Sequence, residues 1–201
     1  MPTQYRSAQK IRMEIAQVAA RIIAVDGIND FFAAKKKAAL QLGLSPGKNM
    51  PTNSEIEQAL VNYQNLFQTE SQPRQLRRLR EIALDAMKFM QKFSPLLTGP
   101  VLSGSATKHS EICLHLFSDE PEQVGFMLEE NGIPYRLLDR TLRITMQSYI
   151  DYPACHFLLE ETPLTLIILP EIRIRASVLS PVDGKPMKRA NLKELERILE
   201  S

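Results

Sequence analysis

The sequence predicts an α+β protein in which a helical N-terminal domain, residues 1–72, precedes a domain built on a mixed β-sheet, residues 73–201. In the first half of the chain, apolar residues recur at spacings of three and four, which is typical of amphipathic helices. In the second half, short apolar runs are bounded by turn residues, which is typical of strands. A strand, a helix and then several strands favour a mixed sheet with helices on one face.

Two helices are expected at the start of the chain. The first covers 5–25 and ends at Gly27, a residue suited to the left-handed conformation at a helix C-terminus. The second covers 31–42, and either Asn29 or Asp30 can cap its N-terminus through a side-chain oxygen.

Two further helices follow. Thr52 with Glu55 three residues later predicts a capping box at the start of a helix over 53–67. The stretch 69–73, which ends in Pro73, is expected to break this helix, and a fourth helix is expected over 74–93. The domain boundary is therefore placed in the break before Pro73.

The second half is expected to begin with a strand from Glu111 to Phe117. Ser118 and Asp119 are expected to cap a helix that starts at Pro121. Further strands are expected over 133–138, 142–150, 154–160 and 164–169, the last as a buried central strand, followed by a turn-rich loop over 180–190 and a helix over 192–199.

Composition excludes several classes of protein. The chain has 201 residues, 44% of them hydrophobic, and a formal net charge of +2, which suits a globular protein. It has no apolar run long enough to span a membrane and no apolar signal segment over 1–12, so we expect a cytoplasmic protein without a membrane partner. The two cysteines, Cys113 and Cys155, do not form a disulfide framework, which fits a reducing compartment.

Charge is unevenly distributed along the chain. Lys and Arg are in excess over residues 1–100, and Asp and Glu over residues 101–201. This asymmetry indicates either an anionic partner for the first half or two charged surfaces that face each other. An arginine cluster lies at the start of the fourth helix, where positive charge is unfavourable toward the helix dipole. It is interpreted either as a solvated helix face or as a group that binds an acidic neighbour or ligand. Its members are Arg74, Arg77, Arg78 and Arg80.

The segment 33–44 resembles the opening of a helix-turn-helix repressor of the tetracycline-repressor type. The resemblance ends at 45–53, where two prolines replace the recognition helix that would read DNA bases. Nonspecific contact with nucleic-acid phosphates and a solvated lysine face stay as alternatives for the basic residues of this region. These residues are Lys35, Lys36, Lys37 and Lys48.

The segment 99–119 is the part of the chain best suited to chemistry. Gly104 and Ser105 provide a turn whose backbone N–H groups and hydroxyl could hold a phosphate. From Glu111 onward, the strand alternation places one polar set on the face opposite the apolar core. This set is Glu111, Cys113, His115 and Phe117.

The same segment resembles the signature of the nucleotidyltransferase superfamily, the DNA-polymerase-beta-like fold. Gly104-Ser105 is followed by Ser110-Glu111-Ile112-Cys113-Leu114, where the family has a Gly-Ser turn and then two carboxylates at i and i+2. The resemblance implies that Glu111, Cys113 and Thr165 occupy the positions of three metal-binding carboxylates. It also implies that phosphates are held by Gly104, Ser105, Lys108 and Ser110, with Lys185 reaching the same site from the C-terminal loop.

Only Glu111 keeps a carboxylate, and this limits the activity that the resemblance implies. Mg²⁺ requires hard oxygen ligands, and two-metal phosphoryl transfer needs several anionic oxygens. Glu111, Cys113 and His115 could instead hold a softer ion such as Zn²⁺, although alternate residues of one strand stand roughly 7 Å apart. The other interpretation is a half-buried thiol beside a hydrogen-bonded histidine.

Three functions follow as hypotheses. The first is a nucleotidyltransferase-fold protein that binds a nucleotide or polynucleotide phosphate, with Mg²⁺ and a nucleoside triphosphate as weakly held cofactors, and whose metal-dependent transfer is lost or altered. The second is an active transferase that adds carboxylates such as Asp119 or Glu171. The third is a non-enzymatic regulatory or scaffolding protein whose helical N-terminal half binds a partner or nucleic acid. A protein partner or a homo-oligomer is left open for any of the three.

A hydrolase is not expected from this sequence. Ser103-Gly104-Ser105 lacks the Gly-x-Ser-x-Gly elbow. Cys155 and His156 are neighbours on an expected strand, so their side chains point to opposite faces and cannot form a nucleophile pair.

Overall fold

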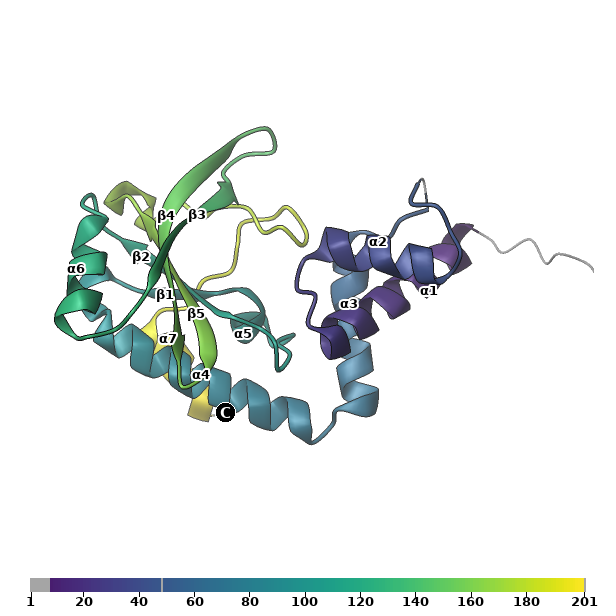
Figure 1. Cartoon of the computed structure of the whole chain (residues 1–201), viewed down its shortest axis with the longest axis horizontal. Helices are drawn as coiled ribbons and strands as arrows, with labels where there is room; N and C mark the ends of the chain where they lie inside the picture. The colour runs from purple at the N-terminus through teal and green to yellow at the C-terminus, as the bar shows by residue number, and fades with distance from the viewer. Residues whose placement is uncertain (1–7, 48, 201) are drawn as a thin grey trace, which may run out of the picture. The chain divides into compact units, whose positions relative to one another are not determined.

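The structure, a computed structural model, describes residues 8–47 and 49–200 (Figure 1). The chain divides into two compact units. The first comprises Met1–Pro73 with Thr107–His109, and the second comprises Arg74–Ala106 with Ser110–Ser201.

The first unit is helical. Helix α1 (Ala8–Arg21) continues into a π-helical turn, Ile22–Asp26, that ends at Gly27 with φ of 74°. Helices α2 (Phe31–Gln41) and α3 (Asn53–Phe67) pack with it around an apolar core. This confirms that the apolar stripes form helices. The largest fully buried side chains of that core are Ile15, Ile22 and Ile56.

The predicted caps of these helices are present. The side chain of Asp30 accepts a hydrogen bond from the N–H of Ala33. Thr52 and Glu55 form the capping box, because the Thr52 oxygen accepts from the Glu55 N–H and the Glu55 carboxylate accepts from the Thr52 N–H. Each bond satisfies a backbone donor that the first helical turn leaves without a partner.

The predicted limits of the fourth helix are wrong at both ends. Helix α4 begins at Ser71 and ends at Phe89, followed by a short 3₁₀ turn, Gln91–Phe93. The predicted break between the third and fourth helices is present at 68–70, but Pro73 is not part of it. Pro73 lies in the first turn of α4, where a backbone N–H has no intrahelical acceptor to lose. The division between the two units therefore falls within this helix.

The second unit contains a five-stranded mixed sheet, as the fold class predicted (Figure 1). Its strands lie in the order β1-β2-β5-β4-β3, with β2 and β5 parallel and the other neighbours antiparallel. The strands are β1 (Leu96–Thr98), β2 (Ile112–Phe117), β3 (Arg136–Arg143), β4 (Tyr149–Leu159) and β5 (Thr162–Leu169). Strand β5 is central and almost wholly buried, as predicted from its apolar run.

Two predicted strands, 133–138 and 142–150, are replaced by a different hairpin. Strand β3 starts at Arg136, residues 144–148 form the turn, and β4 continues through Pro153. Pro153 is tolerated because β4 pairs with β5 only from Ala154 onward, so no acceptor on that side requires the N–H that proline lacks.

Helices cover one face of the sheet. Side chains of α4, α6 (Glu122–Glu130) and α7 (Leu192–Glu200) join one apolar cluster with alternate residues of β2, β4 and β5. Ser118 and Asp119 do not cap α6, which begins after Pro121. Ser118 instead bonds to Glu120, and Asp119 accepts from the N–H of Glu171, so both hold the loop after β2.

The segment after β5 covers part of the opposite face. Val178 and Met187 pack there against residues of β2, β4 and β5. The segment meets the sheet at both edges: the Leu179 N–H donates to the Arg143 oxygen of β3, and Ala190 exchanges two hydrogen bonds with Leu97 of β1. It therefore crosses the face before α7 returns to the helical side. In the part of the chain that the structure describes, no helix could span a bilayer.

Candidate functional site

A polar cluster lies on the sheet face opposite the helices, and we call Glu111, Arg140, His156 and Thr165 the Glu111 cluster. Glu111 directly precedes β2, and Cys113 of β2 is the register partner of Thr165 on β5. Thr165 is in turn the partner of His156 on β4. The parallel neighbours β2 and β5 thus bring together Glu111, Cys113 and Thr165, the positions at which the resemblance places carboxylates, and β4 adds His156.

Hydrogen bonds join the members of the Glu111 cluster. Arg140 Nη2 donates to both carboxylate oxygens of Glu111 at 2.9 Å. Thr165 Oγ1 donates to Glu111 Oε2 at 3.0 Å and lies 2.9 Å from His156 Nδ1. A hydroxyl has a single proton, so once Thr165 donates to Glu111 it can only accept from His156. Nδ1 of His156 therefore carries a hydrogen, and Nε2 faces outward from this chain of bonds.

The arrangement at Glu111 suits an ion pair better than a metal. The guanidinium of Arg140 supplies the positive charge that would otherwise come from a cation. Burial raises the pKa of the Cys113 thiol to about 11, which keeps it neutral. Among residues 8–47 and 49–200, no three His, Cys, Asp or Glu side chains are grouped so that they could hold a metal ion.

His115 differs from the expected hydrogen-bonded histidine. Its side chain is 1% exposed, and neither ring nitrogen has a hydrogen-bond partner among the described residues. Burial, with a smaller contribution from the positive charge of Arg189, lowers the pKa of His115 to about 4. The imidazole is thus held neutral between its register partner Leu96 and the neighbouring strand β5.

The Gly104-Ser105 turn also differs from the expected phosphate cradle. Gly104 has φ of 93° and ends the short helix α5 (Gly99–Ser103). The N–H groups of Gly104 and Ala106 both donate to the carbonyl of Pro100, and the Ser105 hydroxyl lies 3.0 Å from that of Ser103. These two amides cap α5, so the N–H of Gly104 is not free for a ligand in this conformation.

The remaining residues that the resemblance assigns to phosphate binding have different surroundings. Ser110 is buried at the start of the Glu111 segment. Lys108 is exposed and belongs to the segment Thr107–His109 of the first unit. Lys185 is exposed in a turn, where its N–H donates to the side chain of Asp183.

Sequence reasoning missed Arg140 and His156. The predicted strands left Arg140 in a gap between 133–138 and 142–150, so its face could not be assigned. His156 was placed correctly on a strand and opposite to Cys155. Its partner Thr165 lies on another strand, and only the register between β4 and β5 joins them.

The lysines of α2 partly serve the helical unit itself. Lys35 Nζ donates to the Pro51 carbonyl and to the Asn53 side chain, and Lys37 forms an ion pair with Asp26 at 2.8 Å. These contacts hold the segments that flank α2. Two of the three lysines are therefore engaged, which weakens the case for contact with nucleic-acid phosphates. Lys48 lies outside the described residues.

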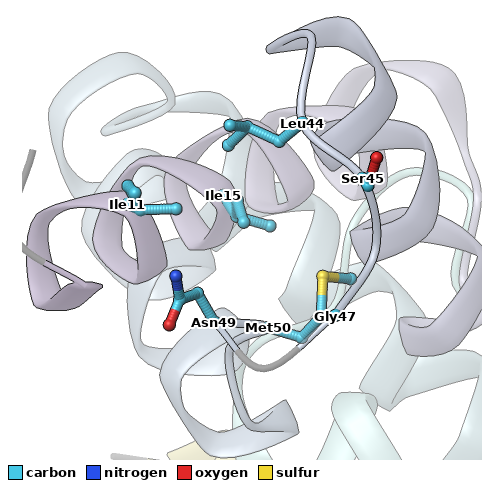
Figure 2. A pocket seen from close by; sticks show the side chains of 7 residues that line it. All are labelled: Ile11, Ile15, Leu44, Ser45, Gly47, Asn49 and Met50. Carbon is cyan, nitrogen blue, oxygen red and sulfur yellow. The ribbon is translucent and has the colours of Figure 1, made fainter.

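A small cavity of about 110 Å³ lies in the helical unit (Figure 2). Figure 2 shows Ile11 and Ile15 of α1 on one side of it and the loop after α2 on the other. Its lining residues are Ile11, Ile15, Leu44, Ser45, Gly47, Asn49 and Met50. Pockets for cofactor-sized ligands have volumes of roughly 300 Å³ or more, and no predicted site residue lines this cavity.

No protein-family model matches the chain, and a search of curated proteins found no match.

The bond chain through Thr165 makes a testable prediction about His156. The Thr165→Val substitution removes both bonds of the hydroxyl, so the imidazole of His156 should lose its fixed Nδ1–H form. We expect a change in the ¹⁵N shifts of both ring nitrogens in long-range ¹H–¹⁵N spectra. The cost in stability should be about 1–3 kcal/mol, because two hydrogen bonds are lost and one of them is to a charged carboxylate.

Thr162→Val is the matched control, because Thr162 is on the same strand with its side chain on the opposite face. It should leave the His156 spectrum as in the parent. An unchanged His156 spectrum in Thr165→Val would contradict the hydrogen-bond assignment.

Proposed function

We propose that this protein is a nucleotidyltransferase-fold protein that binds a phosphate group of a nucleotide or polynucleotide and does not carry out metal-dependent transfer. The observation that supports it is the meeting of Glu111, Cys113 and Thr165 on one sheet face. In the family that the chain resembles, these positions carry the metal-binding carboxylates. Thr165 is more than fifty residues from Glu111 and Cys113 in the sequence.

Loss of transfer follows from the charges at the site. Nucleotidyl transfer by two metal ions requires anionic oxygens that hold both ions against the phosphate. Here one carboxylate is present, and Arg140 already binds both of its oxygens. Cys113 is neutral, and the Thr165 hydroxyl donates rather than coordinates.

Phosphate binding without a metal is consistent with the donors that the Glu111 cluster leaves open. A guanidinium has five N–H donors, and the ion pair with Glu111 uses only Nη2 of Arg140. Nε and Nη1 of Arg140 and Nε2 of His156 have no partner within the described ranges. The side chains of Arg140 and His156 are 39% and 30% exposed, so solvent can reach them. Arg140 would thus supply the charge that a metal ion supplies elsewhere.

Calorimetric titration with ATP tests the proposal. We expect binding in EDTA that added Mg²⁺ does not strengthen, because the positive charge belongs to the protein. Arg140→Gln should weaken the affinity about tenfold, as expected for the loss of one charged hydrogen-bond donor. Arg143→Gln, on the same strand but the other face, is the matched control and should bind like the parent.

The same samples, given Mg²⁺ or Mn²⁺, labelled triphosphates and candidate acceptors, should show no transfer. Transfer that disappears in Glu111→Gln would contradict the loss of catalysis. Absence of ATP and oligonucleotide binding in EDTA would contradict the phosphate site.

A further inference from the structure

Strand β3 has an open outer edge. It is the last strand in the sheet order, so only β4 pairs with it along its length. At its end, the Arg143 carbonyl points away from β4 and accepts from the Leu179 N–H. In an antiparallel pair, successive residues direct both backbone groups alternately toward and away from the partner strand. Leu137, Asp139 and Thr141 therefore direct their N–H and C=O groups outward with Arg143.

These outward groups have no partner in the described parts of the chain, since the bond between Leu179 and Arg143 is the contact made at this edge. Sheet edges are commonly protected by charged side chains, proline, a bulge or a covering segment. Strand β3 pairs residue by residue without a bulge and its sequence contains no proline, so charged side chains are the protection it has. Leu137, with a side chain 73% exposed, lies beside the open groups.

The charges on β3 indicate which kind of chain would suit the edge. The strand carries Arg136, Arg140 and Arg143 against a single Asp139. Arg140 is neutralised by Glu111, whereas Arg143 bonds only to neutral acceptors of its own turn. Arg136 is exposed and has no ion pair in the described ranges. The positive ends of β3 would repel a second copy of β3 and attract an acidic strand.

We propose that the outer edge of β3 binds an extended acidic segment of a partner protein, which joins the sheet as a sixth strand. Main-chain hydrogen bonds to Leu137, Asp139 and Thr141 would provide the affinity. Arg136 and Arg143 would select acidic side chains, and Leu137 would contact an apolar one. This surface is independent of phosphate binding by the Glu111 cluster.

Amide NMR on the full chain tests this inference with a defined probe, an acetylated peptide of alternating glutamate and valine. We expect the peptide to slow hydrogen exchange at the amides of Leu137, Asp139 and Thr141. The amides of Leu138 and Arg140 already pair with β4 and should be unaffected. A lysine-valine peptide and a glutamate-proline peptide are the controls for charge and for strand formation, and neither should protect these amides.

Two substitutions separate the contribution of main-chain hydrogen bonds to peptide binding from that of charge. Asp139→Pro removes one outward N–H without touching the ladder to β4, and should weaken binding about tenfold. The same substitution removes the only carboxylate of β3, so weaker binding of the acidic peptide could not be caused by increased charge repulsion. Arg136 is exposed, so Arg136→Glu should leave the fold intact. It should weaken binding of the acidic peptide by a similar factor. Arg197→Glu on α7 makes the same charge change elsewhere and should have no effect.

Three results would overturn the inference. One is unchanged exchange at the three amides at millimolar peptide. Another is equal protection by the lysine-valine peptide, which would remove the assignment of an acidic partner. The third is self-association of the free protein that protects the same amides, which would make a second copy the occupant of the edge.

Discussion

A chain carrying both Cys113→Asp and Thr165→Asp will unfold more readily than the parent at pH 7, and added Mn²⁺ will restore part of the lost stability. Thr165 is fully buried and Cys113 is partly buried, so each new carboxylate loses hydration beside Glu111. Arg140 can neutralise only one of the three charges. We expect a loss of more than about 4 kcal/mol, the range in which uncompensated buried charges fall.

The recovery depends on the new carboxylates converging on one point, as the register of β2 and β5 implies. Three hard anionic ligands form a site for a divalent ion, and binding to the folded state at 100 times the dissociation constant restores about 2.7 kcal/mol. Thermal melts with and without millimolar Mn²⁺ measure this. The double variant Cys113→Asn, Thr165→Asn is similar in size but uncharged, and its melting temperature should not respond. An Asp variant that responds no more than the Asn variant would remove the main support for the resemblance.

Replacing His115 with leucine will remove most of the acid sensitivity of the second unit. The folded-state pKa of His115 is lowered to about 4, below the value of about 6.5 in an unfolded chain. The unfolded state therefore binds a proton first as the pH falls. Stability from the neutral imidazole is fully present above about pH 6.5 and is lost progressively down to about pH 4, by about 3 kcal/mol in total.

Urea denaturation followed by circular dichroism between pH 7.5 and 4 checks this. His115→Leu should be at least as stable as the parent at pH 7.5, because both ring nitrogens are buried without partners and an apolar side chain has no such cost. Its stability should fall less steeply below pH 6.5. A parent whose stability is the same at pH 7.5 and 4.5 would show that His115 is not held neutral by burial.

Local patterns predicted the helices well. Asp30, Thr52 and Glu55 cap helices because their side chains bond to backbone groups within three residues, and sequence spacing states this directly. Pro73 was misread because a proline that ends one helix and a proline in the first turn of the next look the same in sequence. The difference depends on where the hydrogen-bonded turns begin.

The hairpin of β3 and β4 could not be derived from alternation alone. Pro153 is permitted inside β4 because the pairing of β4 with β5 begins only at Ala154. This misplacement hid Arg140, and with it the ion pair that changes the chemistry expected of Glu111. The Gly104-Ser105 turn was likewise recognised as a turn, but its amides bond to Pro100 of a short helix that the sequence did not predict.

By itself, the sequence determined an α+β chain with helices in its first half, a buried strand at 164–169, and a polar set from Glu111 to His115 on one face of a strand. These depend on periodicity and on contacts between near neighbours along the chain. Only the tertiary structure decided that Thr165 and His156 complete the Glu111 cluster, that Arg140 neutralises it, and that β3 is an open edge. Strand order and register decide such contacts, because they join residues tens of positions apart whose pairing leaves no local pattern.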